Sequence, residues 1–390
     1  MREKPNRIFG FPRNIFFLGL TSLFNDFSSE MVLAVFPAFL TSVLKSGAAS
    51  LGLVDGIAEA ASNIFKIYSG RLSDRFQRRK PLVVFGYTLS VLTRPFFPLV
   101  SNVGGALGLR VLDRVGKGLR DAPRDAIISL STTKGELGVS FGFHRALDTT
   151  GAILGPLVAY FILRAFPERF DAVFGSAFII GILALCTLFF IKDVVATLDE
   201  SDGVIRRSFS DFPTSFRLYL FSVLLLSIGT VPVAVLLLKV HAVGLILADI
   251  PLFYAVYGIS YAAFSTSAGK LSDRIGPRTV IVVGYIALLA GYLVLNLASS
   301  TGSLVAGFFV LGLFPALTDG VQRSMASQLT GPAVRGSALG LLNAATGIGA
   351  LIAGVGGGYL WQAFGPATAC IVGSIVVVVG LAAFSRIQPA

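Results

Sequence analysis

Charged residues are scarce in this sequence. Only 14% of its 390 residues are Asp, Glu, Lys or Arg, whereas 54% are hydrophobic, and the mean hydropathy is +0.79. A soluble domain needs far more polar surface than this composition provides. Hydrophobic stretches about 20 residues long recur along the chain, which is the length that a helix needs to cross a bilayer. The composition therefore predicts a membrane protein.

Cysteine and histidine are rare as well. The chain has two of each, and Cys186 and Cys370 lie in hydrophobic stretches of opposite halves. Two cysteines without a cluster of other ligands predict neither a disulfide framework nor a zinc site. No pairing of nucleophile and base, no phosphate-binding loop and no metal motif stands out. We therefore expect no enzymatic activity, no cofactor and no bound metal.

Positive charge is in excess, with a formal net charge of +11. The basic residues cluster between hydrophobic stretches, as they do in cytoplasmic loops, so nucleic acid is not the expected partner. The loops at 101–103 and 299–302 contain no Lys or Arg. The first 14 residues are basic, and the stretch after them is too long for a signal-peptide core. We expect an integral protein of a prokaryotic inner membrane, with both termini in the cytoplasm.

About twelve stretches are long enough to span a membrane. A helix satisfies all of its backbone groups internally, which the bilayer interior requires. The sequence thus predicts an all-α polytopic membrane protein. The expected spans are Ile15–Leu44, Ser50–Tyr68, Pro81–Val100, Gly104–Ile128, Gly138–Leu163, Ala172–Ile191, Phe216–Leu238, Ile250–Ser267, Val280–Ala298, Ser303–Met325, Gly336–Leu360 and Pro366–Phe384.

The two halves of the chain share an internal repeat. Gly70-Arg-Leu-Ser-Asp-Arg75 recurs as Gly269-Lys-Leu-Ser-Asp-Arg274, an offset of 269 − 70 = 199 residues, and the same offset relates Arg124 to Arg323. Duplication near half the chain length is typical of transporters whose solute site lies between two repeats. We expect two pseudo-symmetric six-helix bundles, residues 1–191 and 214–390, joined by a polar cytoplasmic linker at 192–213.

The segment Gly70–Lys80, read as a loop between the second and third spans, resembles the signature of the major facilitator superfamily. Gln77 departs from the usual glycine, which the second copy keeps as Gly276. The repeat, the number of spans and the central linker extend the resemblance to nearly the whole chain. It implies the major facilitator fold and secondary transport of a small solute.

A narrower resemblance lies on the fifth span. The spacing Gly-x8-Gly-x3-Gly-Pro is similar to a pattern of the proton-driven efflux (drug/proton antiporter) branches, although Ala159 and Tyr160 replace its closing glycines. The resemblance implies export, while close approach of neighbouring helices is the alternative explanation. The residues concerned are Gly142, Gly151, Gly155 and Pro156.

The repeated motif also has a physical interpretation. Its acidic and basic side chains can reach charged groups or helix termini at the cytoplasmic ends of the two halves. Such pairs would hold one conformation and release it in another. Basic residues that only fix the topology are the alternative. The predicted gating residues are Gly70, Asp74, Arg75, Arg78, Gly269, Asp273 and Arg274.

Eight charged residues lie on the fourth span. On a helix they fall within an arc of about 140°, opposite an apolar face. A charge facing lipid near the bilayer centre costs about 3 kcal/mol or more, so this charged face must line a watery cavity or meet partners. Arg120–Asp125 lies near the cytoplasmic end and is expected to be structural. The eight residues are Arg110, Asp113, Arg114, Lys117, Arg120, Asp121, Arg124 and Asp125.

Acidic partners are available on neighbouring spans. Asp26 and Glu30 are four residues apart, as are Asp55 and Glu59, so each pair shares one helix face. A carboxyl group removed from water can bind and release a proton near neutral pH. Ion pairs that keep the helices in register are the alternative for each residue. The predicted proton-coupling residues are Asp26, Glu30, Asp55, Glu59, Asp148 and His144.

The arginines suggest a place for the solute. They can hold a solute carboxylate or keep the acids ionised, while the second half offers a largely apolar and aromatic wall. The predicted substrate-binding residues are Arg110, Asp113, Arg114, Lys117, Arg145, Tyr254, Tyr257 and Asn343.

The sequence favours a monomeric, proton-coupled exporter of a small organic solute that works by alternating access. An importer or exchanger of an organic anion or metal chelate is the second hypothesis, and the acidic pairs also leave room for a cation. A non-transporting receptor or a lipid scramblase is a third class. The expected partners are the solute, protons and the lipid bilayer.

Overall fold

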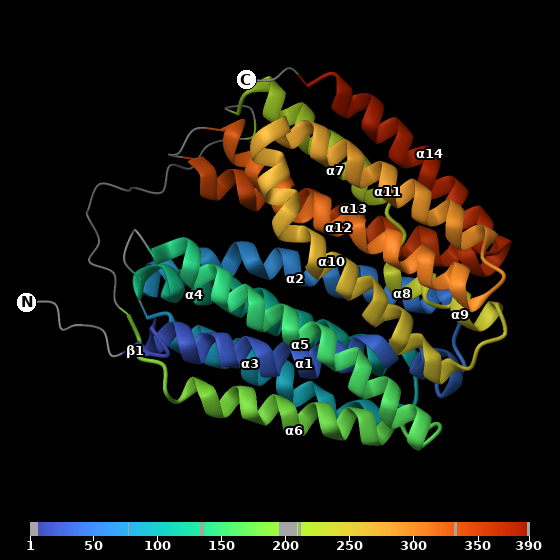
Figure 1. Ribbon diagram of the computed structural model, residues 1–390, viewed down its shortest axis with the longest axis horizontal. Coiled ribbons are helices and arrows are strands. Elements are labelled where there is room, and N and C mark those ends of the chain that lie inside the picture. The colour runs from blue at the N-terminus through green and yellow to red at the C-terminus, as the bar shows by residue number, and fades with distance from the viewer. Residues whose placement is uncertain are drawn as a thin grey trace, which may run out of the picture. The chain divides into compact units, whose positions relative to one another are not determined.

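The computed structural model describes residues 7–76, 78–132, 136–194, 209, 212–330 and 334–387, and nearly all of them are helical (Figure 1). A two-residue hairpin of β1 (Arg7–Ile8) and β2 (Phe11–Pro12) precedes the helices. The predicted all-α fold is confirmed. The helices are α1 (Arg13–Ser42), α2 (Ala48–Phe76), α3 (Lys80–Thr93), η1 (Arg94–Leu99), α4 (Val103–Leu130), α5 (Leu137–Ala165), α6 (Phe170–Leu188), α7 (Thr214–Ile228), α8 (Val233–Leu236), α9 (Lys239–Ala242), η4 (Leu247–Asp249), α10 (Ile250–Ile275), α11 (Pro277–Leu297), α12 (Thr301–Gln328), α13 (Arg335–Phe364) and α14 (Pro366–Ser385).

Ten helical segments within the described ranges are long and apolar enough to cross a membrane. The helices α2 and α4 are not among the ten, although they have 29 and 28 residues. Both are long enough to span a bilayer, and both carry many charged residues. Together with the ten, they correspond to the spans that the sequence predicts.

Local sequence signals explain where several helices begin. Gly276 and Gly365 have φ angles of +87° and +89°, a region that favours glycine, and a proline follows each of them to start α11 and α14. Asn102 caps α4, because its Oδ1 atom accepts a hydrogen bond from the Gly105 N–H group at 2.9 Å. These starts lie within a few residues of the predicted ones.

The repeated motif belongs to helices and not to loops. Helix α2 continues to Phe76, so Gly70–Arg75 lies on its last turns, and Gly269–Arg274 lies at the end of α10. The expected loop conformation is therefore wrong. Neither copy has a proline or an internal glycine that would stop the helix, and α10 ends only where Gly276 follows.

The seventh span is broken. Helix α7 ends at Ile228 and α8 begins at Val233, whereas the sequence predicts one continuous helix over Phe216–Leu238. The hydroxyl group of Tyr292 on α11 bridges the break: it accepts a hydrogen bond from the Val231 N–H group at 2.7 Å and donates one to the Gly229 carbonyl at 3.2 Å. The backbone N–H and carbonyl groups that the break leaves without helical partners thereby form hydrogen bonds inside the protein.

We expect Tyr292→Phe to destabilise the protein by about 1–3 kcal/mol, because the buried Val231 N–H group loses its acceptor. Thermal unfolding of the purified protein in detergent measures this loss. Tyr359→Phe is the matched control, since Tyr359 is 58% exposed on α13. An unchanged unfolding temperature for Tyr292→Phe would contradict the role of the hydroxyl bridge.

The chain forms two compact units. One contains residues 1–36 and 61–198, and the other contains residues 37–60 and 199–390. Both α1 and α2 therefore contribute residues to each unit. The division into bundles 1–191 and 214–390 stays a prediction, and most of the expected linker at 192–213 lies outside the described residues.

Glycines bring helices into close contact within each unit. In the first unit, Gly116 of α4 lies against the backbone of Gly86 on α3. In the second unit, Gly52 of α2 lies against Gly354 and Gly358 of α13, and a Cβ atom added at Gly52 would be only 3.0 Å from the Gly354 carbonyl carbon. Such contacts let backbones approach closely in a membrane protein.

The duplication is visible in equivalent side chains that differ in charge. Tyr87 and Tyr285, both fully buried, are related by an offset of 285 − 87 = 198 residues. Arg124 lies near Tyr87, whereas Gln322 donates a hydrogen bond to the Tyr285 hydroxyl at 3.1 Å. The same offset makes Gln322 the counterpart of Arg124. The sequence matched Arg124 to the exposed Arg323, which is one residue away.

Candidate functional site

Close packing of α5 on α1 builds the candidate site, which lies within the first unit. Gly151 of α5 faces the backbone of Leu23 and Phe27, and a Cβ atom added there would be 2.8 Å from the Phe27 nitrogen. Gly155 continues the contact one turn later, against Phe27 and Met31. Two glycines of the predicted motif thus press α5 against α1, and Asp148 lies on the preceding turn of α5.

The packing brings two carboxyl groups together. Asp26 of α1 and Asp148 of α5 lie within hydrogen-bonding reach of each other. Ser22 donates to Asp148 Oδ1 at 2.6 Å, and Asn25 Nδ2 donates to Asp26 Oδ1 at 3.0 Å. Arg145 forms an ion pair with Asp148 at 3.3 Å. We call Asp26 and Asp148 the carboxyl pair.

Arg94 reaches the carboxyl pair from η1. Its Nη2 atom donates to Asn25 Oδ1 at 3.1 Å, and the same Asn25 donates to Asp26. The Arg94 side chain is only 1% exposed. Its Nη1 atom lies against Gly181 of α6, where any Cβ atom would clash with it. Neither Arg94 nor Asn25 is among the predicted site residues, although a lone arginine inside an apolar span is itself a signal of function.

Arg110 and Arg120, on the charged face of α4, contact other residues of the first unit. Arg110 forms an ion pair with Asp113 at 3.2 Å and lies over the Phe36 ring at 5.3 Å. Arg120 donates to Ser90 Oγ at 2.9 Å and lies over the Tyr87 ring at 4.4 Å. These contacts are with protein groups, as the cost of a lipid-facing charge requires.

Asp121, Arg124 and Asp125, on the same face of α4, belong to a cluster of ion pairs. Asp121 lies 3.9 Å from Lys66 of α2 and 3.5 Å from Arg124. Arg124 also pairs with Asp125 at 2.9 Å. Acids and bases alternate here and hold α2 against α4. The structural role expected for Arg120–Asp125 stays a prediction.

The other predicted proton-coupling residues lie elsewhere. His144 is buried on α5, and its Nε2 atom has no hydrogen-bond partner among the described residues. Glu30 faces Gly155 across the α1–α5 contact. Asp55 and Glu59 are half-buried on the part of α2 that belongs to the second unit.

The predicted substrate-binding residues are divided between the units. Arg114 and Lys117 are half-buried on α4 in the first unit. In the second unit, the Tyr254 and Tyr257 rings stack with their centroids 6.0 Å apart, and Asn343 is half-buried on α13. Each unit therefore offers a separate part of the predicted set, and their joint role stays a prediction.

The predicted gating residues make few described contacts. The side chains of Gly70, Asp74 and Arg75 lie outside the described part of the protein, and Arg78, Gly269, Asp273 and Arg274 are exposed. Their gating role stays a prediction.

Basic residues just after the motif close the ends of other helices. Lys80 Nζ donates to the Ile191 carbonyl at 2.6 Å, beyond α6, and Arg278 Nη1 donates to the Ile387 carbonyl at 3.0 Å, beyond α14. A cation is favourable at a helix C-terminus, so both copies use the same device to fix the third helix to the sixth.

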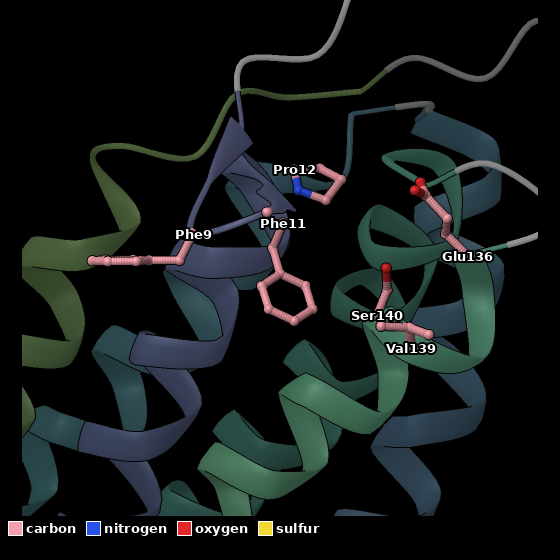
Figure 2. Close-up of a pocket in the computed structure, with 7 residues that line it drawn as sticks. Phe9, Phe11, Pro12, Glu136, Val139 and Ser140 are labelled. Atoms are coloured by element: carbon pink, nitrogen blue, oxygen red, sulfur yellow. The ribbon is translucent and has the colours of Figure 1, made fainter.

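A cavity of about 230 Å³ lies at the end of the first unit, apart from the carboxyl pair. Figure 2 shows Phe11 and Pro12 of the hairpin on one side and Glu136, Val139 and Ser140 at the start of α5 on the other. Arg7 binds both Glu136 oxygens, at 2.7 and 2.9 Å. Asp148 lies about 18 Å further along α5, so this cavity does not serve the pair.

Comparison with known proteins identifies the family. The model of the Major Facilitator Superfamily matches residues 18–241 and 218–390. The chain therefore belongs to the major facilitator superfamily, whose members are transporters and not enzymes. It is an integral membrane protein.

Individual relatives and solved structures match most of the chain. An uncharacterized MFS-type transporter of Methanocaldococcus jannaschii, MJ1317, is 34% identical over 375 residues, covering 94% of this chain and 93% of that protein. The class B tetracycline resistance protein of Escherichia coli is 26% identical over 348 residues, covering 83% of each chain. A mutant of the nucleoside transporter NupG has a similar structure, with a TM-score of 0.78 and 15% identity over 96% of this chain and 99% of that one.

Proposed function

We propose that the protein is a proton-coupled exporter of small organic solutes and that the carboxyl pair carries the coupled proton. The carboxyl groups of Asp26 and Asp148 lie within hydrogen-bonding reach. A carboxylate oxygen only accepts hydrogen bonds, so a hydrogen bond between the two groups requires one shared proton. Two adjacent carboxylates away from water repel each other strongly, which favours keeping that proton until the surroundings change. The close approach of the two buried carboxyl groups is the main support for the proposal.

Two further features support export coupled to protons. The similarity to a tetracycline resistance protein favours an efflux substrate. The concentration of ionisable side chains in the first unit separates proton binding from the aromatic residues Tyr254 and Tyr257, which we propose contact the solute. Alternating access then exposes the pair to one side of the membrane at a time.

Reconstitution into proteoliposomes tests the proposal, with tetracycline as the probe. Each pH unit across the membrane supplies about 1.4 kcal/mol per proton, enough for about a tenfold concentration ratio if one proton exchanges for one solute molecule. We expect tetracycline to move against its gradient in exchange for protons. Flux that ignores the imposed pH gradient would replace the antiporter with a uniporter or another coupling ion.

An organic-anion exchanger is the second candidate, because the Arg145 side chain is 59% exposed and its guanidinium group can therefore meet an anion. Succinate is the probe for this alternative. Exchange of internal for external succinate without a pH gradient would favour it over the exporter.

A further inference from the structure

Arg94 is a buried cation that the ion pairs of α4 do not account for. Its described hydrogen bond goes to the neutral Asn25, and its Nε and Nη1 atoms have no hydrogen-bond partner among the described residues. Burying an arginine at 1% exposure with so few partners is costly. A charge kept at such a cost serves a purpose other than stability.

Arg94 stands between two acids. Asp113 of α4 acts on it electrostatically more strongly than Asp26 of α1 does. Asp113 already has Arg110 as its ion-pair partner at 3.2 Å, whereas Asp26 is linked to Arg94 through Asn25. Two hydrogen bonds through Asn25 thus link Arg94 to Asp26 of the carboxyl pair.

Among the described residues, Glu30 lies four residues from Asp26 on α1, and other charged and titratable groups that act near the pair lie on three further elements. Helix α5 contributes Arg145 and His144, α4 contributes Lys117, Arg120 and Arg124, and α3 contributes Tyr87. Arg145 pairs with Asp148, and its side chain is 59% exposed. Arg94 differs from it in being fully buried and on the Asp26 side.

We propose that Arg94 is a positioning residue for the carboxyl pair: through Asn25 it holds the Asp26 carboxyl group against Asp148, and its charge balances the pair when the proton leaves. The inference rests on the proposed function, since it assigns a role within the same proton site. When the proton departs to water the pair gains one negative charge, and the fixed guanidinium group lowers the cost of that charge.

Infrared difference spectroscopy of the purified full-length protein tests this role without any solute. The carbonyl band of a protonated carboxyl group, assigned by its loss in Asp26→Asn, is followed as a function of pH. We expect Arg94→Gln to move the midpoint of this titration to higher pH by about one unit or more, because a nearby positive charge is removed. Asn25→Ala should shift it in the same direction, while Arg94→Lys should stay closer to the wild type.

Arg169→Gln is the matched control. It removes one positive charge from the same unit, but Arg169 lies between α5 and α6 in an exposed ion pair with Asp171. We expect no shift of the midpoint. If Arg94→Gln fails to fold, Asn25→Ala decides the question, because a purely structural role would lower the unfolding temperature of this variant and leave its midpoint at the wild-type value.

The two proposals fail separately. A shifted midpoint in Arg94→Gln, in a protein whose wild type does not accumulate tetracycline, would retain the role of Arg94 and overturn the exporter. Proton-driven accumulation by the wild type, with unmoved midpoints in Arg94→Gln and Asn25→Ala, would retain the exporter and overturn the role of Arg94.

Discussion

Asp26→Asn and Asp148→Asn should each abolish proton-driven transport. The amide keeps the size of the side chain and can still form a hydrogen bond across the pair, but it cannot exchange a proton. In proteoliposomes with a gradient of one pH unit, we expect the tetracycline ratio to fall from about ten to one. Exchange of solute down its own gradient should continue, because binding and conformational change do not need the driving proton.

A control and a double variant sharpen this test. Asp171→Asn removes a carboxylate of the same unit that lies in an exposed ion pair with Arg169, and it should retain the wild-type ratio. The double variant Asp26→Asn/Asp148→Asn should be no worse than either single variant, since the two groups act as one site. Accumulation that survives in both single variants would exclude the pair as the coupling site.

The second large effect concerns the glycines that place the pair. We expect Gly151→Ala to destabilise the protein by about 1–3 kcal/mol, because its Cβ atom would meet the α1 backbone at Leu23 and Phe27. Relief of this clash must move α5 away from α1 and separate Asp148 from Asp26. The temperature of thermal unfolding and the accumulation of tetracycline should therefore both be lower than in the wild type.

Gly142 provides the matched control on the same helix. A Cβ atom added at Gly142 would have no atom within 4 Å, so Gly142→Ala should be neutral or stabilise the helix by up to about 1 kcal/mol. Equal loss in the two variants would mean that the motif needs flexible glycines rather than close packing. Loss only at Gly151 would assign the motif to helix contact.

Hydropathy predicted the helices, and the repeated Gly70–Arg75 motif together with the number of spans predicted the family. The periodicity of α4 also predicted a charged face that must line a watery cavity or meet partners, and Arg110 and Arg120 contact protein groups. Both features follow from the properties of single segments, since span length and helical period are local.

The sequence could not show which of the six predicted proton-coupling residues form the carboxyl pair, because that depends on contacts between helices. Asp26/Glu30 and Asp55/Glu59 have the same spacing, and nothing in that spacing shows that Asp26 meets Asp148 on another helix. The register between α1 and α5 is decided by where Gly151 and Gly155 allow contact. Arg94 escaped notice because a single base barely lowers the hydropathy of its span. The break after Ile228 was equally hidden, since Tyr292, which stabilises it, lies far away in the sequence.

The offset of 198 residues that relates Tyr87 to Tyr285 also relates Arg94 to Tyr292. Each residue reaches the first helix of its own repeat, Arg94 at Asn25 and Tyr292 at Gly229. The two equivalent positions thus make the same kind of contact within their repeats, although Arg94 carries a charge and Tyr292 does not. An uncharged hydroxyl at this position carries no charge that could balance a proton, so we expect substitutions that change solute preference around it to leave intact the proton coupling that we propose for the other repeat.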